Sequence, residues 1–296
     1  MRNLRSIATV LGCSLTVCAA VTVDEPSLAV AAPGQADLQA TLLRSYSAEE
    51  ADQGVAVDAQ YFYAIDNHTI GKYRRDNGDK LIVWEGDDHG PLQHINSCQV
   101  AGERLICAHS NYPSVPMASS VEWFETQTLQ PAGSHSLGID LPGSLTWVVP
   151  WSDGYLACFA HYDHRPPESR DHRHTTLIHY DAHWRRQGGW TFPETVLQRL
   201  APYSASGGAL GDDGLLYVMG HDRPELYVLG LPWQSSVLVH IATIAISAEG
   251  QAFVWDFVSE RTIYAIDRRR HQVLVFKLPA VDIPAHARRF PASPRQ

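Results

Sequence analysis

A short apolar strand that ends in His or Asp occurs five times in the chain, and this repeat limits the folds that the chain can adopt. The five copies are Tyr63–Asp66, Ile106–His109, Cys158–His161, Val218–His221 and Tyr264–Asp267. Each copy follows a turn and an earlier apolar run, and further runs follow it, the last of them more polar. Self-similarity with four short strands in each unit, at a period of about 40 to 60 residues, is typical of a β-propeller.

We therefore predict an all-β fold, a five-bladed β-propeller. The first unit shows the pattern most clearly, and its strands are expected at Gly54–Asp58, Tyr61–Asp66, Thr69–Tyr73 and Lys80–Trp84. The later units are expected to start at His94, Ser144, Ser206 and Gln251. Six blades is the main alternative, because the third and fourth units are long enough to contain an irregular extra strand. An all-β sandwich is the other alternative, but it would not require the register to repeat.

The two ends of the chain complement each other. The last unit stops at Leu278-Pro279 after its third strand, whereas Leu38–Tyr46 reads as a strand that belongs to no unit. An N-terminal strand that completes the last blade would close the ring and leave no open edge. We therefore expect the propeller to span residues 38–279. The Pro-, Arg- and Ala-rich residues 280–296 are expected to be disordered.

The N-terminus has the features of an export signal. In residues 1–31 a basic start precedes the mostly apolar Ile7–Ala20, and Ala29–Ala31 fits a cleavage site. The apolar run is too short to span a membrane comfortably, so we expect no transmembrane segment. The protein is expected to be exported, to the periplasm or the extracellular space. A lipoprotein anchored at Cys18 is less favoured, because the preceding residue fits a lipobox poorly.

The charge and the cysteines add further limits. The net charge of −9 is unchanged without residues 1–31, which hold two basic and two acidic residues. An acidic protein is a poor partner for nucleic acid, so we expect none. The expected ligand is a small molecule or a carbohydrate, and the protein is expected to be a monomer. Outside the signal, Cys98 and Cys107 fall opposite each other across a turn at Gly102-Glu103. A cross-strand disulfide and two buried thiols are both open, and Cys158 is expected to be a buried thiol.

Two sets of polar residues are expected to meet at one end of the propeller channel. The first strand of a blade lines the channel and the second runs antiparallel to it, so the start of one and the end of the other share a face. The ends of the second strands are Asp66, His109, His161, His221 and Asp267. The starts of the first strands are Gln53, His94 with Asn96, Ser144, Ser206 and Gln251.

Three imidazoles flanked by carboxylates suit a divalent metal ion, Zn, Mn, Fe or Cu rather than Ca. We predict that His109, His161 and His221 bind this metal, with Asp66 and Asp267 completing or orienting the ligand set. Such a metal could polarise a substrate or supply hydroxide, and His94 is the expected catalytic acid or base. The expected substrate-binding residues are Asn96, Asn111, Tyr162, Asp222, Gln53, Ser144, Ser206 and Gln251.

The leading hypothesis is thus a metal-dependent hydrolase or isomerase/lyase that acts on a small polar molecule. A metal-free site with one His as general acid or base is an alternative, as is a hydrogen-bonded network that only fills the channel. A carbohydrate- or protein-binding module without catalysis is the third alternative. It would use the long loops Ser110–Met117 and Tyr162–His174, since long loops in compact domains are often functional.

The segments Tyr63–Tyr73 and Thr262–Phe276 resemble the repeat units of the propeller superfamily that includes gluconolactonase-like and NHL-like proteins. With His109–Pro113 and Gly220–Asp222, the chain is also similar to exported bacterial proteins described as cycloisomerase-like. The first resemblance implies a divalent metal on the propeller axis. Gluconolactonase-like enzymes use Glu, Asn and Asp there, whereas this chain offers mainly His, which favours a softer metal.

Overall fold

The computed structural model describes residues 38–138, 143–163 and 170–291. All of them belong to one compact unit, residues 35–296. The predicted export signal and Cys18 lie outside the described residues. Within the described part of the chain, no helix is long and apolar enough to cross a membrane.

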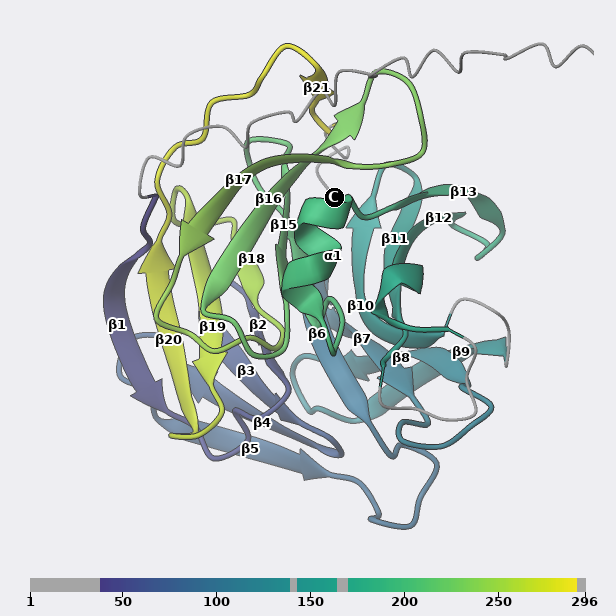
Figure 1. Cartoon of the computed structure of the whole chain (residues 1–296). Coiled ribbons are helices and arrows are strands. Elements are labelled where there is room, and N and C mark those ends of the chain that lie inside the picture. Colours follow the sequence, from purple (N-terminus) through teal and green to yellow (C-terminus); the bar gives the residue numbers. More distant parts are fainter. Residues whose placement is uncertain (1–37, 139–142, 164–169, 292–296) are drawn as a thin grey trace, which may run out of the picture. The chain divides into compact units, whose positions relative to one another are not determined.

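The strands form five antiparallel sheets, which are the blades of a β-propeller (Figure 1). Blade 1 contains β2 (Gly54–Val57), β3 (Tyr61–Asp66), β4 (Thr69–Arg74) and β5 (Lys80–Glu85). Blade 2 contains β6 (Ile95–Ala101), β7 (Arg104–Ser110), β8 (Ser119–Glu125) and β9 (Pro131–Gly138). Blade 3 contains β10 (Ser144–Trp151), β11 (Gly154–Ala160), β12 (Thr176–Asp181) and β13 (Arg186–Thr191).

The remaining strands complete the ring. Blade 4 contains β14 (Gly207–Leu210), β15 (Leu216–Met219), β16 (Glu225–Pro232) and β17 (Val239–Ala245), with β21 (Ala287–Arg288) paired to the end of β16. Blade 5 contains β18 (Val254–Asp256), β19 (Thr262–Asp267), β20 (Gln272–Lys277) and β1 (Thr41–Ser47). The first strands of the blades contact one another in the cycle β2, β6, β10, β14, β18 and back to β2. The helices of the described residues are α1 (Glu194–Leu200) and the 3-10 turn η1 (His172–His174).

The inner strands of each blade bury both of their faces, because the blade stands between two other blades. In β3 the run Phe62–Ile65 is fully buried. Tyr63 and Ile65 pack against blade 2, whereas Phe62 and Ala64 pack against blade 5. A strand covered on both sides is continuously apolar rather than alternating, which is why the repeated apolar runs were visible in the sequence.

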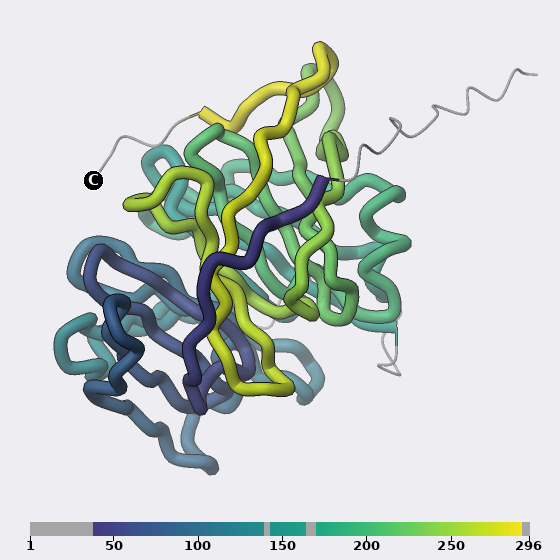
Figure 2. Tube along the Cα trace, turned by 90° about the vertical axis from the view of Figure 1, so that its left-hand side faces the viewer, coloured from purple at the N-terminus to yellow at the C-terminus, as the bar shows by residue number. Residues whose placement is uncertain are grey.

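The N-terminal strand closes the ring as predicted. β1 pairs antiparallel with β20, in a register that sets Leu42 opposite Phe276 and Tyr46 opposite Val273. Figure 2 shows the two segments, from opposite ends of the chain, running side by side. The prediction of five blades with N-terminal closure is confirmed, and the described residues contain no sixth sheet.

The predicted disorder of residues 280–296 is wrong for residues 280–291. β21 pairs with the end of β16, so this segment has a defined path. Phe290 is 2% exposed, and its ring lies 5.9 Å from that of Trp151 and 6.1 Å from that of Trp190. The indole nitrogen of Trp151 also donates to the carbonyl oxygen of Pro291. Burial of one large aromatic ring outweighs a composition that is typical of disorder.

Cys98 and Cys107 form a disulfide across β6 and β7, so of the two open alternatives the structure has the disulfide. Their strands pair in the register expected from the Gly102-Glu103 turn, with the two Cys opposite each other. Cys158 is a buried free thiol.

We expect Phe290→Ala to destabilise the protein by about 3 kcal/mol, because the substitution removes a buried aromatic ring and leaves a cavity. Urea or thermal unfolding measures this effect. His286→Ala, at an exposed position of the same segment, is the matched control and should unfold like the parent. Equal stability of the Phe290 variant and the parent would mean that the segment does not pack in solution.

Candidate functional site

The register of the blades places the two predicted sets of polar residues at the same end of the channel. The start of a first strand pairs with the end of the second in blades 1, 2, 3 and 4, as in Gly54 with Ile65 and Ile95 with His109. The loops that enter β2, β6, β10, β14 and β18 therefore meet the loops that leave the second strands. We call this end of the channel the mouth.

Side chains from all five blades follow one another around the mouth. We call this set the mouth ring, and it consists of Asp52, Asn67, His94, Tyr112, Tyr162, Tyr203, His221 and Arg268. Tyr162 is buried and the other members are half-buried. Contacts between successive members lead from Asn67 in blade 1 to Arg268 in blade 5. Arg268 then lies next to Asp52, whose backbone N–H donates to the carbonyl oxygen of Ile65 in blade 1. The mouth ring thus combines polar with aromatic side chains, most of which are partly exposed.

Asp66, Asn67 and His94 form a hydrogen-bonded chain at the mouth. The Asp66 carboxylate accepts from the side-chain NH₂ of Asn67 at 2.9 Å and from its backbone N–H at 2.6 Å. Because a carboxylate can only accept, the amide oxygen of Asn67 faces His94, where it meets Nδ1. Nδ1 of His94 must therefore carry a hydrogen, and Nε2 is the basic nitrogen of the neutral ring. This arrangement orients an imidazole for proton transfer.

The loop after β7 brings an aromatic ring to His94. The Tyr112 ring centroid lies 4.9 Å from that of His94, and the Ser110 N–H donates to the His94 carbonyl oxygen at 3.1 Å. Asn111, a predicted substrate ligand, braces this loop instead. Its side chain accepts from the Ala118 N–H at 2.8 Å and donates to the Pro116 carbonyl at 2.9 Å. Asn111 therefore fixes the shape of the loop that carries Tyr112.

The aromatic part of the mouth ring continues into blades 3 and 4. The rings of Tyr112 and Tyr162 meet edge to face at 5.4 Å, and both Tyr112 and Tyr203 pack against the cluster that contains Tyr162 and Met117. Tyr203 in turn stacks on His221, with ring centroids 4.0 Å apart. These rings give the mouth an apolar wall beside its polar groups, as in many small-molecule sites.

His221 lies between a carboxylate and a guanidinium. Nη1 of Arg268 can only donate, so Nε2 of His221 accepts this bond, at 3.3 Å. Nδ1 of His221 then donates to Asp222, at 2.5 Å. His221 is therefore a bridge between Asp222 and Arg268, and both nitrogens of its neutral ring are engaged.

His109 faces the interface between blades 1 and 2 instead of the channel. Its side chain is buried, and its Nε2 accepts from the Gln93 N–H at 3.2 Å. Nδ1 then donates to the Ser120 hydroxyl at 2.9 Å, and that hydroxyl donates to Glu122 at 2.5 Å. Burial lowers the pKa of His109 to about 4 and raises the pKa of Glu122. His109 is therefore a neutral anchor for the segment that carries His94.

The remaining predicted residues fill the start of the channel or lie at its edge. Ser144 donates to Ser110 at 2.8 Å, and Asn96 donates to the Leu145 carbonyl at 2.8 Å, so these buried groups satisfy one another. Two further predicted substrate contacts, Gln53 and Gln251, are also buried. Ser206 is half-buried, with its N–H bonded to Met219. Asp267 accepts from Arg270 at 2.8 Å in the turn after β19. These placements fit polar filling of the channel, which the sequence left open as an alternative.

The predicted metal ligands do not come together. No three of His109, His161, His221, Asp66 and Asp267 have ligand atoms within 4.8 Å of one another. His109 and His221 use both ring nitrogens in the hydrogen bonds described above, and His161 is buried beside the ring of His174. The sequence pattern correctly indicated a shared end of the channel, but the side chains do not bring their ligand atoms together into one set. The axial metal that the resemblance implied does not fit these residues.

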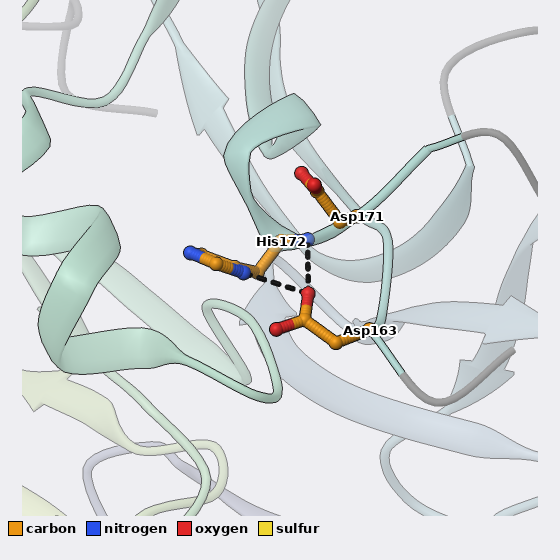
Figure 3. Close-up of side chains that lie close together, drawn as sticks. All are labelled: Asp163, Asp171 and His172. Atoms are coloured by element: carbon orange, nitrogen blue, oxygen red, sulfur yellow. Dashed lines mark hydrogen bonds and ion pairs between the residues drawn. The ribbon is translucent and has the colours of Figure 1, made fainter.

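One other group has metal-ligand chemistry among the described residues. Ligand atoms of Asp163, Asp171 and His172 lie within 4.8 Å of one another in the loop between β11 and β12 (Figure 3). Asp163 accepts from the backbone N–H and Nδ1 of His172, at 3.0 and 2.7 Å. Arg173 binds the Asp171 carboxylate and lowers its pKa. These hydrogen bonds and this ion pair explain why the three residues lie together, since they hold the loop in place.

The mouth-ring residues that the sequence did not indicate are Asn67, Tyr203, Arg268 and Asp52, whereas Tyr112 was included only within the loop Ser110–Met117 of the binding-module alternative. The reason is their position in the blades: the members of the mouth ring lie outside the strands, most of them within two residues of a strand end. Asn67 and Arg268 directly follow the strand ends Asp66 and Asp267, on which the prediction concentrated. A search one residue beyond each strand end would have found both.

We expect the stability of the parent to fall as the pH is lowered from 6.5 to about 4, in part through His109. Between these values the unfolded chain protonates this ring and the buried ring stays neutral, so folding is opposed by up to about 3 kcal/mol. In His109→Gln this part of the pH dependence should disappear. Glu122 acts in the opposite sense, because a carboxyl with a raised pKa loses stability as the pH rises, so the difference between parent and variant isolates His109. Urea unfolding across this range measures it, and parallel profiles would contradict the proposed burial.

We also expect His221→Ala to leave the metal content of the dialysed protein unchanged, because His221 does not lie with two other ligands. Elemental analysis by mass spectrometry, on protein made without a His tag, measures this content. The matched control is His172→Ala, which changes the loop cluster. A stoichiometric metal in the parent that is lost in the His221 variant would restore the predicted metal centre.

Comparison with known proteins supports the fold. No protein-family model matches the sequence, and no curated protein matches it. Among solved structures, the glutaminyl cyclase of Myxococcus xanthus is 12% identical and covers 83% of this chain and 100% of its own, with a TM-score of 0.56. The hydrazine synthase of Kuenenia stuttgartiensis is 13% identical, covers 77% and 72%, and has a TM-score of 0.45. The WD40 repeats of RRP9 are 11% identical, cover 84% and 99%, and have a TM-score of 0.44. At 12% identity the likeness to the cyclase shows a shared β-propeller fold.

Proposed function

We propose that the protein is an enzyme that catalyses a proton-transfer reaction, such as cyclisation or hydrolysis, on a small polar substrate at the mouth. The observation that carries this proposal is the Asp66–Asn67–His94 chain, in which the tautomer of a half-buried imidazole is fixed by its partners. A carboxylate behind a positioning group and an imidazole is a recurrent arrangement for general acid–base catalysis.

The roles follow from the geometry. Nε2 of His94 would take a proton from the attacking group and return it to the leaving group. Asn67 would hold the ring orientation, and Asp66 would hold Asn67. Tyr112, at 4.9 Å from the imidazole, would place the substrate against the ring. Metal dependence, which the sequence suggested, is not part of this proposal, because the predicted ligands do not converge.

The likeness to a glutaminyl cyclase suggests the first reaction to test. Cyclisation of an N-terminal glutaminyl residue needs an amine to lose a proton and an amide nitrogen to gain one, which a single histidine can serve. Fold likeness does not transfer a reaction, so lactones and simple esters belong in the same panel.

A binding module without catalysis is the second candidate, and the aromatic wall of Tyr112, Tyr162 and Tyr203 favours it. Such a wall could stack on a carbohydrate ring. The two candidates differ in what His94 does. A binding module would show no turnover of any substrate, and it would keep its affinity in His94→Gln.

We also propose that the protein is exported. The Cys98–Cys107 disulfide supports this proposal, because disulfides persist in oxidising compartments. The basic and apolar start of the chain is the second support.

In a screen of N-terminal glutaminyl peptides, lactones and esters, we expect turnover by the parent and a loss of about 10²- to 10⁴-fold in kcat for His94→Gln. Asn67→Asp should keep activity and move the acidic limb of the pH profile to higher pH, because a carboxylate stabilises the imidazolium. His89→Gln, in an exposed loop, is the control and should match the parent. Turnover that survives His94→Gln unchanged would refute the assigned role, and no turnover in the whole panel would favour the binding module.

A further inference from the structure

Three consecutive arginines follow the end of β19, and they differ in direction. The side chains of Arg269 and Arg270 are 77% and 75% exposed and pair with Glu249 and Asp267. The Arg268 side chain is 35% exposed and turns to the mouth, where its Nη1 donates to His221 at 3.3 Å. Of these three arginines, Arg268 therefore belongs to the mouth ring, whereas the other two face the solvent.

The guanidinium of Arg268 has spare hydrogen-bonding capacity. Other half-buried arginines of the structure hold a carboxylate at bonding distance, as Arg75 does with Asp256 at 2.5 Å and Arg199 with Glu225 at 2.6 Å. For Arg268 the partner Asp52 is 3.6 Å away, beyond hydrogen-bond range. Its Nη2 donates to no group in the part of the chain that the structure describes. A guanidinium that is held in place with unused donors is suited to a ligand carboxylate.

The charges around Arg268 alternate. Asp52 lies on one side, and its other carboxylate oxygen accepts from Gln53 at 3.2 Å. On the other side His221 connects Arg268 to the carboxylate of Asp222. A ligand that offered only a carboxylate would be attracted by Arg268 and repelled by Asp52 at a similar distance. A ligand that carries an ammonium group next to its carboxylate would match both.

We infer that Arg268 and Asp52 bind the α-amino carboxylate of a free amino acid, with Arg268 on the carboxylate and Asp52 on the ammonium group. The two functional groups of an α-amino acid are one carbon apart, which fits protein groups whose charged atoms lie 3.6 Å apart. The stacked pair of Tyr203 and His221 forms the adjacent wall and receives the ligand side chain. This inference rests on the proposed function only in placing the substrate at the mouth.

The test is equilibrium binding, measured by calorimetry with the twenty common amino acids. The strongest binder is then compared with its N-acetyl derivative, which lacks the ammonium group, and with its amide, which lacks the carboxylate. We expect each derivative to bind about 10- to 100-fold more weakly, the usual loss when a charged hydrogen bond is removed. Absence of binding by all twenty amino acids would overturn the inference, as would equal binding of the derivatives.

Variants assign the contacts. Arg268→Gln should weaken binding of the amino acid by about 10- to 100-fold, whereas Arg269→Gln, the matched control from the same turn, should bind like the parent. Asp52→Asn should abolish the preference for the free amine over the N-acetyl derivative. Circular dichroism and the melting temperature establish that each variant is folded. If Arg268→Gln does not fold, the result with Asp52→Asn decides, because a retained preference for the free amine would also overturn the inference.

Binding is measured without turnover, so the inference and the proposed function fail separately. An amino acid that binds through Arg268, with no turnover in the substrate panel, would support the inference and count against catalysis. Turnover that depends on His94, with no amino-acid binding, would support catalysis and overturn the inference.

Discussion

The pairing of β1 with β20 is the interaction on which the rest of the structure depends. It joins the two ends of the propeller, and it also fastens blade 5 to blade 1. Arg44 and Tyr46, on β1, donate to the carbonyl oxygens of Asp76 and Arg75 in the outer hairpin of blade 1, at 2.6 and 2.5 Å. Tyr46 is also part of the apolar cluster between these blades. Without this closure the mouth ring would be open between Arg268 of blade 5 and Asp52 of blade 1.

Much of the fold could be predicted because the inner strands of every blade are buried on both faces. This burial requires long apolar runs that polar turns interrupt, and the runs repeat with the blades. The bounds expected for the strand Tyr61–Asp66 agree with β3, and the spare N-terminal strand was correctly matched to the incomplete blade. The path of residues 280–291 could not be predicted from composition. It depends on the pairing of β21 with β16 and on the burial of Phe290 among residues of blades 3 and 4, which are far away in the sequence.

The sequence correctly indicated that the two sets of polar residues share one end of the channel, but it did not indicate which way each side chain points. His109 shows the physical reason. Side chains alternate along a strand, so His109 shares a face with Leu105 and Cys107, which pack against blade 1. Its position at a strand end suggested that its side chain faces the channel, whereas the alternation of side chains along the strand places it between blades 1 and 2. The same alternation, applied to each strand, would have separated blade-facing residues from those near the mouth.

The mouth ring follows from a general constraint on propellers. Within a strand, the packing between blades decides where each side chain points. A side chain there could turn to the mouth only by giving up its contacts with the neighbouring blade. Residues outside the strands are free of that constraint. Seven of the eight members of the mouth ring lie one or two positions from a strand, and Tyr203 lies in the connection between α1 and β14. His94 combines both situations. Its backbone is held by Ser110, and its preceding residue is held by the buried His109, while its ring extends toward Asn67 and Tyr112. A rigid ladder therefore positions a residue that the ladder does not contain. The packing between blades thus constrains the residues inside the strands, whereas those at the mouth lie outside this constraint, and the propeller fold is shared with another protein at only 12% identity.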